Sequence, residues 1–192
     1  PKEGEIVKVS NANKVQEWIL MPKAFQDATK LPGIPQSTVI SVIGHSNVGK
    51  STLINHAIVS AQKQGLIPVI IDTENSFSFQ YAINMGFEAE PIYGDVEIED
   101  VDEETGEISV HTENRITHWD GNFIYFNNAI LCEQFGDMDY SSGSKTKTKR
   151  KTAVIEDVAM CINTILDAQE NGDIDQGLLF VWDSIGSIGS YK

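Results

Sequence analysis

The stretch from Gly44 to Ser51 carries residue types that suit phosphate binding. It fits the pattern G-x-x-x-x-G-K-[ST] of a phosphate-binding loop. Its glycines let the backbone turn sharply and approach a phosphate, and the loop N–H groups then form an anion-binding nest at a helix N-terminus. In this pattern Lys50 reaches the β- and γ-phosphates, and Ser51 places its hydroxyl on Mg²⁺. We therefore predict a nucleoside triphosphate site contacted by Gly44, His45, Ser46, Asn47, Val48, Gly49, Lys50, Ser51 and Thr52.

Two acidic residues follow apolar runs that resemble buried strands. Glu74 comes after Ile67–Ile71, and Asp183 comes after Gly177–Trp182. A carboxylate beside a γ-phosphate can orient or deprotonate the attacking water, and an aspartate at a strand end suits the Mg²⁺-associated acid of phosphate-loop enzymes. We predict catalytic roles for Glu74 and Lys50 and metal binding by Ser51 and Asp183. Asp72 is the alternative to Glu74 if the strand register slips by two residues.

The elements that must position these residues alternate between strand and helix patterns. Thr38–Ile43 is a β-branched run that predicts a buried strand before the loop, and a helix is expected to follow as far as Gln64. A second strand is predicted over 67–74. Strand, helix and strand make a right-handed βαβ unit, so the sheet is expected to be parallel. Since ligands lie at the carboxyl ends of such strands, the loop, Glu74 and Asp183 should meet there.

Together with further elements, the sequence predicts an α/β fold, in which a mostly parallel sheet is flanked by helices. Residues 1–37 are expected to be a lead-in containing a short amphipathic helix from Asn11 to Leu20, and Pro32–Pro35 a loop. The remaining predicted elements are helix 77–85 capped by Ser76, strand 122–126, helix 152–171 with a strong apolar period, and strand 177–183.

Charge is unevenly distributed along the chain. The net charge is −14, yet Asp95–Glu113 contains nine acidic residues without lysine or arginine, and five of the seven residues Lys145–Lys151 are basic. The acidic stretch predicts an exposed β-hairpin turning at Thr105-Gly106, within an insertion at about 92–120. A solvated insertion is favoured over a metal or partner site. The loop at about 136–152 is expected to be flexible, and it either is merely solvated or contacts a nucleic-acid backbone.

Size and composition fit one globular core. The chain has 192 residues, 41% of them hydrophobic, and no apolar run approaches the roughly 20 residues that a membrane span needs. No signal segment is visible. Cys132 and Cys161 are not part of a C-x-x-C pair, so both are expected to be reduced thiols. These features predict a cytoplasmic protein, in a host cytoplasm if it is phage-encoded, without a membrane partner.

Two segments resemble RecA/RadA-type recombinases. Ile71–Phe77 is similar to the segment that holds their catalytic glutamate, and Leu178–Ser184 is similar to their second nucleotide motif. Leu31–Pro35 also fits their lead-in. The resemblance implies that Lys50 and Ser51 bind phosphate and Mg²⁺, that Glu74 activates water and that Asp183 supports the Mg²⁺ shell. It also implies that residues 38–192 are the N-terminal part of a RecA-like ATPase core.

The spacing departs from that family. Glu74 and Asp183 are 109 residues apart, about twice the family's separation, and the acidic hairpin and basic loop account for the excess. The family's DNA-binding loops, γ-phosphate sensor and remaining sheet strands come later than this segment. The chain would therefore be part of a larger core.

The predicted function is that of a DNA-dependent ATPase in recombination or repair. It would use ATP and Mg²⁺ and act on single-stranded DNA as a homo-oligomer, a filament or a ring. A helicase-type or signalling RecA-fold ATPase and a non-enzymatic nucleotide clamp remain alternatives. A GTPase is a further alternative, since Asp183–Gly186 fits D-x-x-G. However, Asp183 lies 133 residues after Lys50, and no N-K-x-D segment follows.

Overall fold

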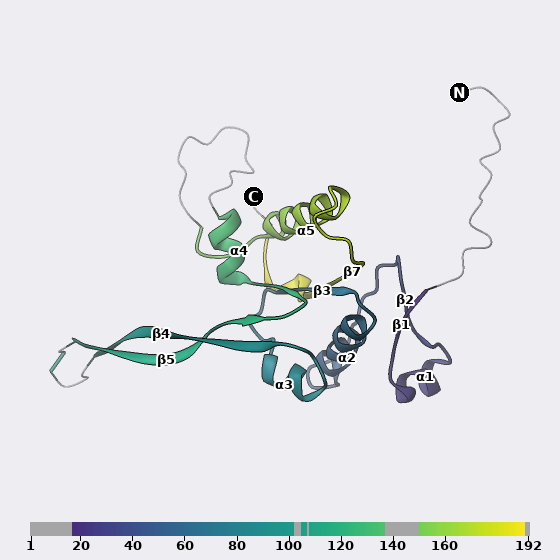
Figure 1. Cartoon of the computed structure of the whole chain (residues 1–192), viewed down its shortest axis with the longest axis horizontal. Helices are drawn as coiled ribbons and strands as arrows, with labels where there is room; N and C mark the ends of the chain where they lie inside the picture. Colours follow the sequence, from purple (N-terminus) through teal and green to yellow (C-terminus); the bar gives the residue numbers. More distant parts are fainter. Residues whose placement is uncertain (1–16, 102–104, 107, 137–149, 191–192) are drawn as a thin grey trace, which may run out of the picture.

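The computed structural model of the chain describes residues 17–101, 105–106, 108–136 and 150–190 (Figure 1). Its centre is a three-stranded parallel sheet with the strand order β6-β3-β7. The strands are β3 (Ile67–Asp72), β6 (Ile124–Asn127) and β7 (Leu178–Asp183). The predicted α/β class and parallel sheet are confirmed for this part of the chain. The predicted second strand ends at Asp72, two residues before Glu74.

Helices cover both faces of this sheet. Val69 and Ile71 of β3 pack into a cluster with residues of helices α4 and α5, whereas Ile70, between them, packs against Ile58 and Phe79 from the other face. Successive strand side chains point to opposite faces, so the two helix pairs lie on opposite sides of β3, as Figure 1 shows. These helices are α2 (Lys50–Lys63), α3 (Phe79–Asn84), α4 (Asn128–Phe135) and α5 (Ile155–Glu170).

The observed helices agree to different degrees with those predicted from the sequence. Helices α2 and α5 lie where apolar periodicity predicts them. Helix α3 begins two residues late, because the Ser78 hydroxyl accepts a hydrogen bond from the N–H of Tyr81, at 3.2 Å, and so caps it in place of Ser76. Helix α4 was not predicted. None of the helices formed by the described residues is long and apolar enough to cross a membrane.

Two buried features stabilise the α4–α5 side. The guanidinium of Arg150 donates to both carboxylate oxygens of Asp157, at 2.8 and 2.6 Å, and the Asp157 side chain is fully buried. Cys132 and Cys161 are both buried free thiols, as predicted, and burial raises the pKa of Cys161 to about 12. The rest of the predicted flexible loop, residues 137–149, lies outside the described part of the chain.

The N-terminal lead-in differs from the prediction. Strand β1 (Trp18–Leu20) pairs antiparallel with β2 (Gly33–Pro35), and helix α1 (Lys23–Thr29) connects them. The predicted helix that reaches Leu20 was therefore wrong in its described residues, and so was the predicted loop at Pro32–Pro35. The other residues of that predicted helix, 11–16, lie outside the described residues. A side chain on Gly33 would collide with the Ile19 carbonyl oxygen, so glycine permits this close pairing, which no local pattern reveals.

The expected strand at Thr38–Ile43 is absent from the structure. This segment pairs with none of the described strands, and the side chains of Val39 and Ile43 are 100% and 92% exposed. β-Branched residues favour an extended backbone, but a strand also needs a neighbour that accepts its hydrogen bonds. The prediction of a buried strand before the loop is wrong for this structure, because that neighbour is missing among the described strands.

Strands β4 (Glu90–Val101) and β5 (Ile108–Asp120) form an antiparallel pair that projects from the body as an arm (Figure 1). The arm is longer than the hairpin expected from the sequence. Its base is fixed to α3, because the rings of Trp119 and Phe79 stack with centroids 4.8 Å apart. The predicted turn includes Thr105 and Gly106, but residues 102–104 and 107 lie outside the described residues.

Candidate functional site

The phosphate-binding loop runs directly into the N-terminus of α2. Gly49 caps the helix with a φ of 92°, and Asn47 also has a positive φ, 62°. Gly49 is therefore required for its backbone conformation, since a side chain there would meet no atom within 4 Å. No side chain caps α2, so its first N–H groups are without a capping acceptor, as at helix N-termini that bind anions. The predicted loop-to-helix arrangement is present even though the preceding strand is not.

Lys50 folds back over its own loop. Its ammonium donates to the carbonyl oxygens of Gly44 and His45, at 2.9 and 2.7 Å. The adjacent residue, Ser51, is exposed at the start of the helix. A cation and a hydroxyl thus lie where the loop joins α2.

Glu74 lies in the turn that follows β3. Asn75, the next residue, has a φ of 54° in the left-handed region. The Glu74 side chain is exposed, and its Oε1 accepts a hydrogen bond from the hydroxyl of Ser184. This hydrogen bond joins two segments that are far apart in sequence. It places Glu74 and Asp183 on neighbouring segments.

Asp72 has a different environment from Glu74. Only 1% of its surface is exposed. Its carboxylate accepts hydrogen bonds from the N–H groups of Ser76, at 3.0 Å, and Phe77, at 2.8 Å, and from the Tyr125 hydroxyl, at 3.1 Å. These hydrogen bonds hold the turn around Glu74, so Asp72 has a structural role. The exposed Glu74 is the acid that water can reach.

Asp183 ends β7 directly beside Asp72 of β3 in the parallel register. Burial and the negative charges of Glu74 and Asp72 raise the pKa of Asp183, and the positive charge of Lys50 opposes this rise. The loop lysine and the strand-end acids therefore act on one another electrostatically at one edge of the sheet. The peptide bond between Asp183 and Ser184 is cis.

The acids suit a metal ion that is bound partly by its substrate. Among the described residues, no three His, Cys, Asp or Glu side chains converge as a metal cage. Mg²⁺ typically takes one or two carboxylates together with substrate phosphates and water. Ser51 and Asp183 offer oxygen ligands of the type it prefers, so the residues present fit a shared Mg²⁺–phosphate site.

Three polar residues in the site had no role in the sequence-based prediction. Thr73 is buried, and its hydroxyl lies at the centre of hydrogen bonds to the end of β7 and the residues after it. Ser184 contacts Glu74, and Tyr125 contacts Asp72. The serine that follows Asp183 was a visible signal, but the contacts of Thr73 join positions about 110 residues apart and have no local signature.

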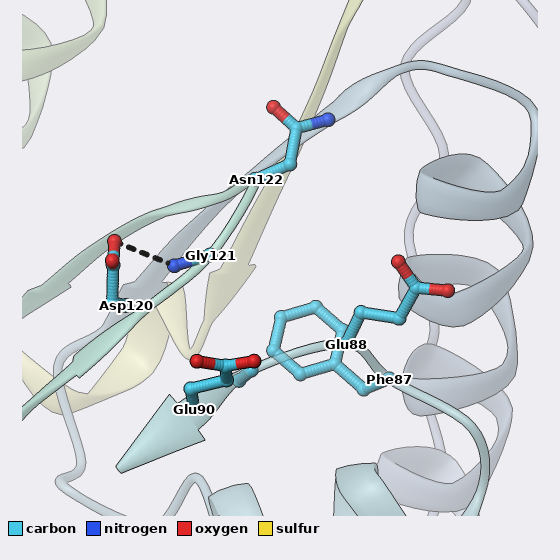
Figure 2. Close-up of a pocket in the computed structure, with 7 residues that line it drawn as sticks. Phe87, Glu88, Glu90, Asp120, Gly121 and Asn122 are labelled. Atoms are coloured by element: carbon cyan, nitrogen blue, oxygen red, sulfur yellow. Dashed lines mark hydrogen bonds between the residues drawn. The ribbon is translucent and has the colours of Figure 1, made fainter. Parts of the chain in front are cut away.

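A separate pocket of about 440 Å³ lies at the base of the arm. Figure 2 shows the Glu88 carboxylate pointing away from those of Glu90 and Asp120, so the three acids do not converge. Gln62 of α2 fixes the wall through hydrogen bonds with the N–H and carbonyl of Glu88, at 2.7 and 2.9 Å. None of the predicted nucleotide, catalytic or metal residues lines this pocket, whose walls are Phe87, Glu88, Ala89, Glu90, Asp120, Gly121 and Asn122.

The matches between this chain and known proteins agree with one another. The profile of the RecA N-terminal domain family matches residues 2–114. Protein RecA of Thermotoga petrophila is 32% identical over 110 residues, covering 53% of this chain and 31% of that protein. Protein RecA of Aquifex aeolicus is 32% identical over 93 residues, covering 47% and 27% respectively. The match thus spans about a third or less of these relatives' length. No solved structure matches this chain.

Proposed function

This chain belongs to the RecA family, and from that membership we propose that it is the N-terminal part of a DNA-dependent ATPase in recombination or repair. The observation that carries the proposal is the meeting of three groups at one edge of the sheet. These groups are the phosphate-binding loop with Lys50, the exposed Glu74 and the strand-end Asp183. The family match supports the identity of the fold, and the site supports phosphoryl transfer to water.

In this proposal the loop residues 44–52 bind the phosphates of ATP. Lys50 exchanges its two carbonyl partners for β- and γ-phosphate oxygens, which are stronger acceptors because they are charged. Ser51 and Asp183 hold Mg²⁺, which when bound neutralises charge on the phosphates. The raised pKa of Asp183 fits this role, since a divalent cation relieves the crowding of negative charge that raises it.

Glu74 would orient a water molecule in line with the bond between the γ-phosphorus and the β–γ bridging oxygen. The water oxygen bonds to phosphorus as that bridging bond breaks, the water proton passes to the Glu74 carboxylate or to solvent, and ADP and phosphate leave. Such reactions need mainly positioning and charge stabilisation from the protein. The Ser184 hydroxyl, which donates to Glu74, helps to hold the carboxylate in place.

Other parts of the proposal concern partners. We propose single-stranded DNA, bound through regions outside these residues and through the basic run Lys145–Lys151, and a homo-oligomer in the cytoplasm. The arm of β4 and β5 would be an insertion relative to the family. The exposed apolar run Thr38–Ile43 supports a larger core, since it offers an unpaired β-branched segment to further strands.

The test is ATP hydrolysis by the protein with and without single-stranded DNA, for the wild type and Glu74→Gln. Glu97→Gln, on the exposed arm, is the matched control. We expect DNA-stimulated hydrolysis that Glu74→Gln reduces by about 100-fold or more, comparable to losing a positioned catalytic group. Hydrolysis that is insensitive to DNA, equal with GTP and unchanged in Glu74→Gln would overturn the proposal.

A further inference from the structure

We propose that Thr73 is a positioning residue for hydrolysis, whose hydroxyl fastens the turn carrying Glu74 to the segment carrying Asp183 and Ser184. This inference rests on the proposed function, because it assigns Thr73 an effect on Glu74. Thr73 itself is 4% exposed and lies between the buried Asp72 and the exposed Glu74. It is therefore placed to act through its neighbours and has no direct route to substrate.

Both the backbone and the side chain of Thr73 contact the end of β7 and the residues after it. Its N–H donates to the Asp183 carbonyl at 2.9 Å. Its hydroxyl lies 3.0 Å from the Ser184 carbonyl oxygen and 3.3 Å from that of Asp183. The indole N–H of Trp182 and the hydroxyl of Ser187 lie 3.1 and 2.7 Å from the same oxygen atom.

These contacts use the full hydrogen-bonding capacity of one hydroxyl. A threonine hydroxyl has one proton to donate and two lone pairs to accept with. Here it donates to the carbonyls of the Asp183–Ser184 segment and accepts from Trp182 and Ser187. A valine at position 73 would keep the shape but leave the half-buried indole N–H without its acceptor. The side-chain connection between the two segments would also be lost.

The connection matters because Glu74 is positioned from both sides. Its backbone follows Thr73 directly, and its carboxylate accepts a hydrogen bond from Ser184, whose carbonyl is bound by the Thr73 hydroxyl. Releasing that hydroxyl lets the turn and the Ser184 segment shift relative to one another. Misplacement of a catalytic group by about 1 Å can cost about 100-fold in rate.

Nucleotide binding should survive this change. The predicted phosphate contacts come from residues 44–52 on the loop and α2, and the hydrogen bonds of Thr73 run to residues 182–187. A positioning role therefore predicts a loss in kcat with little change in KM or nucleotide affinity. General destabilisation would instead lower the fraction of active protein and the unfolding temperature together.

The experiment compares Thr73→Val and Thr73→Ser in the full protein. Thr164→Val, an exposed position on α5 whose hydroxyl bonds a helix carbonyl, is the matched control. We expect Thr73→Val to lower kcat by about 10- to 100-fold with KM within about twofold. Thr73→Ser, which restores the hydroxyl, should keep most of the activity. The Trp182 indole resonance should shift in the valine variant alone.

Each outcome decides the inference. Wild-type rates in a folded Thr73→Val protein, or an equal loss in Thr73→Ser, would overturn it while leaving the proposed ATPase intact. If Thr73→Val does not fold, Thr73→Ala removes the same hydroxyl without a branched side chain, and an unchanged kcat there would also overturn it. A wild type without Glu74-dependent hydrolysis removes the proposed function, and the Thr73 role is rejected with it.

Discussion

The two halves of the candidate site are built very differently. The strand-end half, around Asp72, Thr73 and Asp183, is buried or half-buried, and hydrogen bonds join the end of β3 to β6 and to residues 183 and 184. The loop half follows the exposed Thr38–Ile43 segment, and Lys50 is held by its own loop carbonyls. In our proposal the strand-end half is therefore organised before nucleotide binds, whereas the loop half gains contacts when it binds nucleotide or packs against further residues.

The largest effect is expected from a substitution in the loop half. Lys50→Ala removes the cation that we assign to the β- and γ-phosphates, and hydrolysis should fall by about 100-fold or more, with weaker nucleotide binding. Lys63→Ala, at the exposed far end of the same helix, is the control. Steady-state hydrolysis and titration with a fluorescent ATP analogue measure the effect. Retention of tight ATP binding in Lys50→Ala would contradict the assignment.

One substitution made in both halves sharpens the comparison. Val69→Thr, at a fully buried position of β3, places a hydroxyl in an apolar core, which should cost about 1–3 kcal/mol of unfolding free energy. Val39→Thr, at a fully exposed position, should cost less than about 0.5 kcal/mol. Urea unfolding measures both. Similar losses at the two positions would mean that the segment before the loop is packed in solution.

A smaller effect is expected from Tyr125→Phe. It removes the hydroxyl that donates to the Asp72 carboxylate, at 3.1 Å, and keeps the ring. The two backbone N–H groups still satisfy the carboxylate, so the loss should be about 1 kcal/mol of unfolding free energy. Tyr93→Phe on the exposed arm should leave stability unchanged. A neutral Tyr125→Phe would show that the strand-end half is less dependent on these bonds than its geometry indicates.

The smallest effect concerns pH. The pKa of Asp183 is raised in the folded protein, so the folded state binds more protons than the unfolded state between the unfolded pKa, about 3.9, and the folded pKa. Stability therefore falls as pH rises through the window between these two pKa values. Asp183→Asn removes this loss, so its unfolding temperature should be slightly above wild type at pH 7 and equal to it below that window. Asp175→Asn is an exposed control. A lower unfolding temperature for Asp183→Asn at pH 7 would contradict the sign.

Elements with a strong local pattern were predictable from sequence. The period of α5, the glycine loop before α2 and the apolar runs of β3 and β7 each carry their own signal. Helix α4 was missed although Asn127 caps it, with its side chain accepting from the Ile130 N–H at 2.9 Å. That cap was a readable clue, since asparagine favours helix N-termini.

Features that depend on distant partners were not predictable. Thr38–Ile43 has strand propensity, but pairing is decided by which strands lie beside it. The three-residue strands β1 and β2 exist only as a pair. At the site, the sequence singled out Lys50, Glu74 and Asp183 as candidates, and their roles stay predictions. It did not identify Thr73, because a buried hydroxyl acquires its role only when residues 182–187 fold against it.

The inward-facing Arg150, whose side chain is 15% exposed, changes how the basic run would respond to salt. The run Lys145–Lys151 has five cations in sequence, but the guanidinium of Arg150 is turned inward onto Asp157. At most four cations of the run are then available to displace counterions from a nucleic acid. The logarithm of a single-strand binding constant should change with the logarithm of salt by a slope no steeper than about −3 from this run. A steeper dependence would locate additional phosphate contacts elsewhere in the protein.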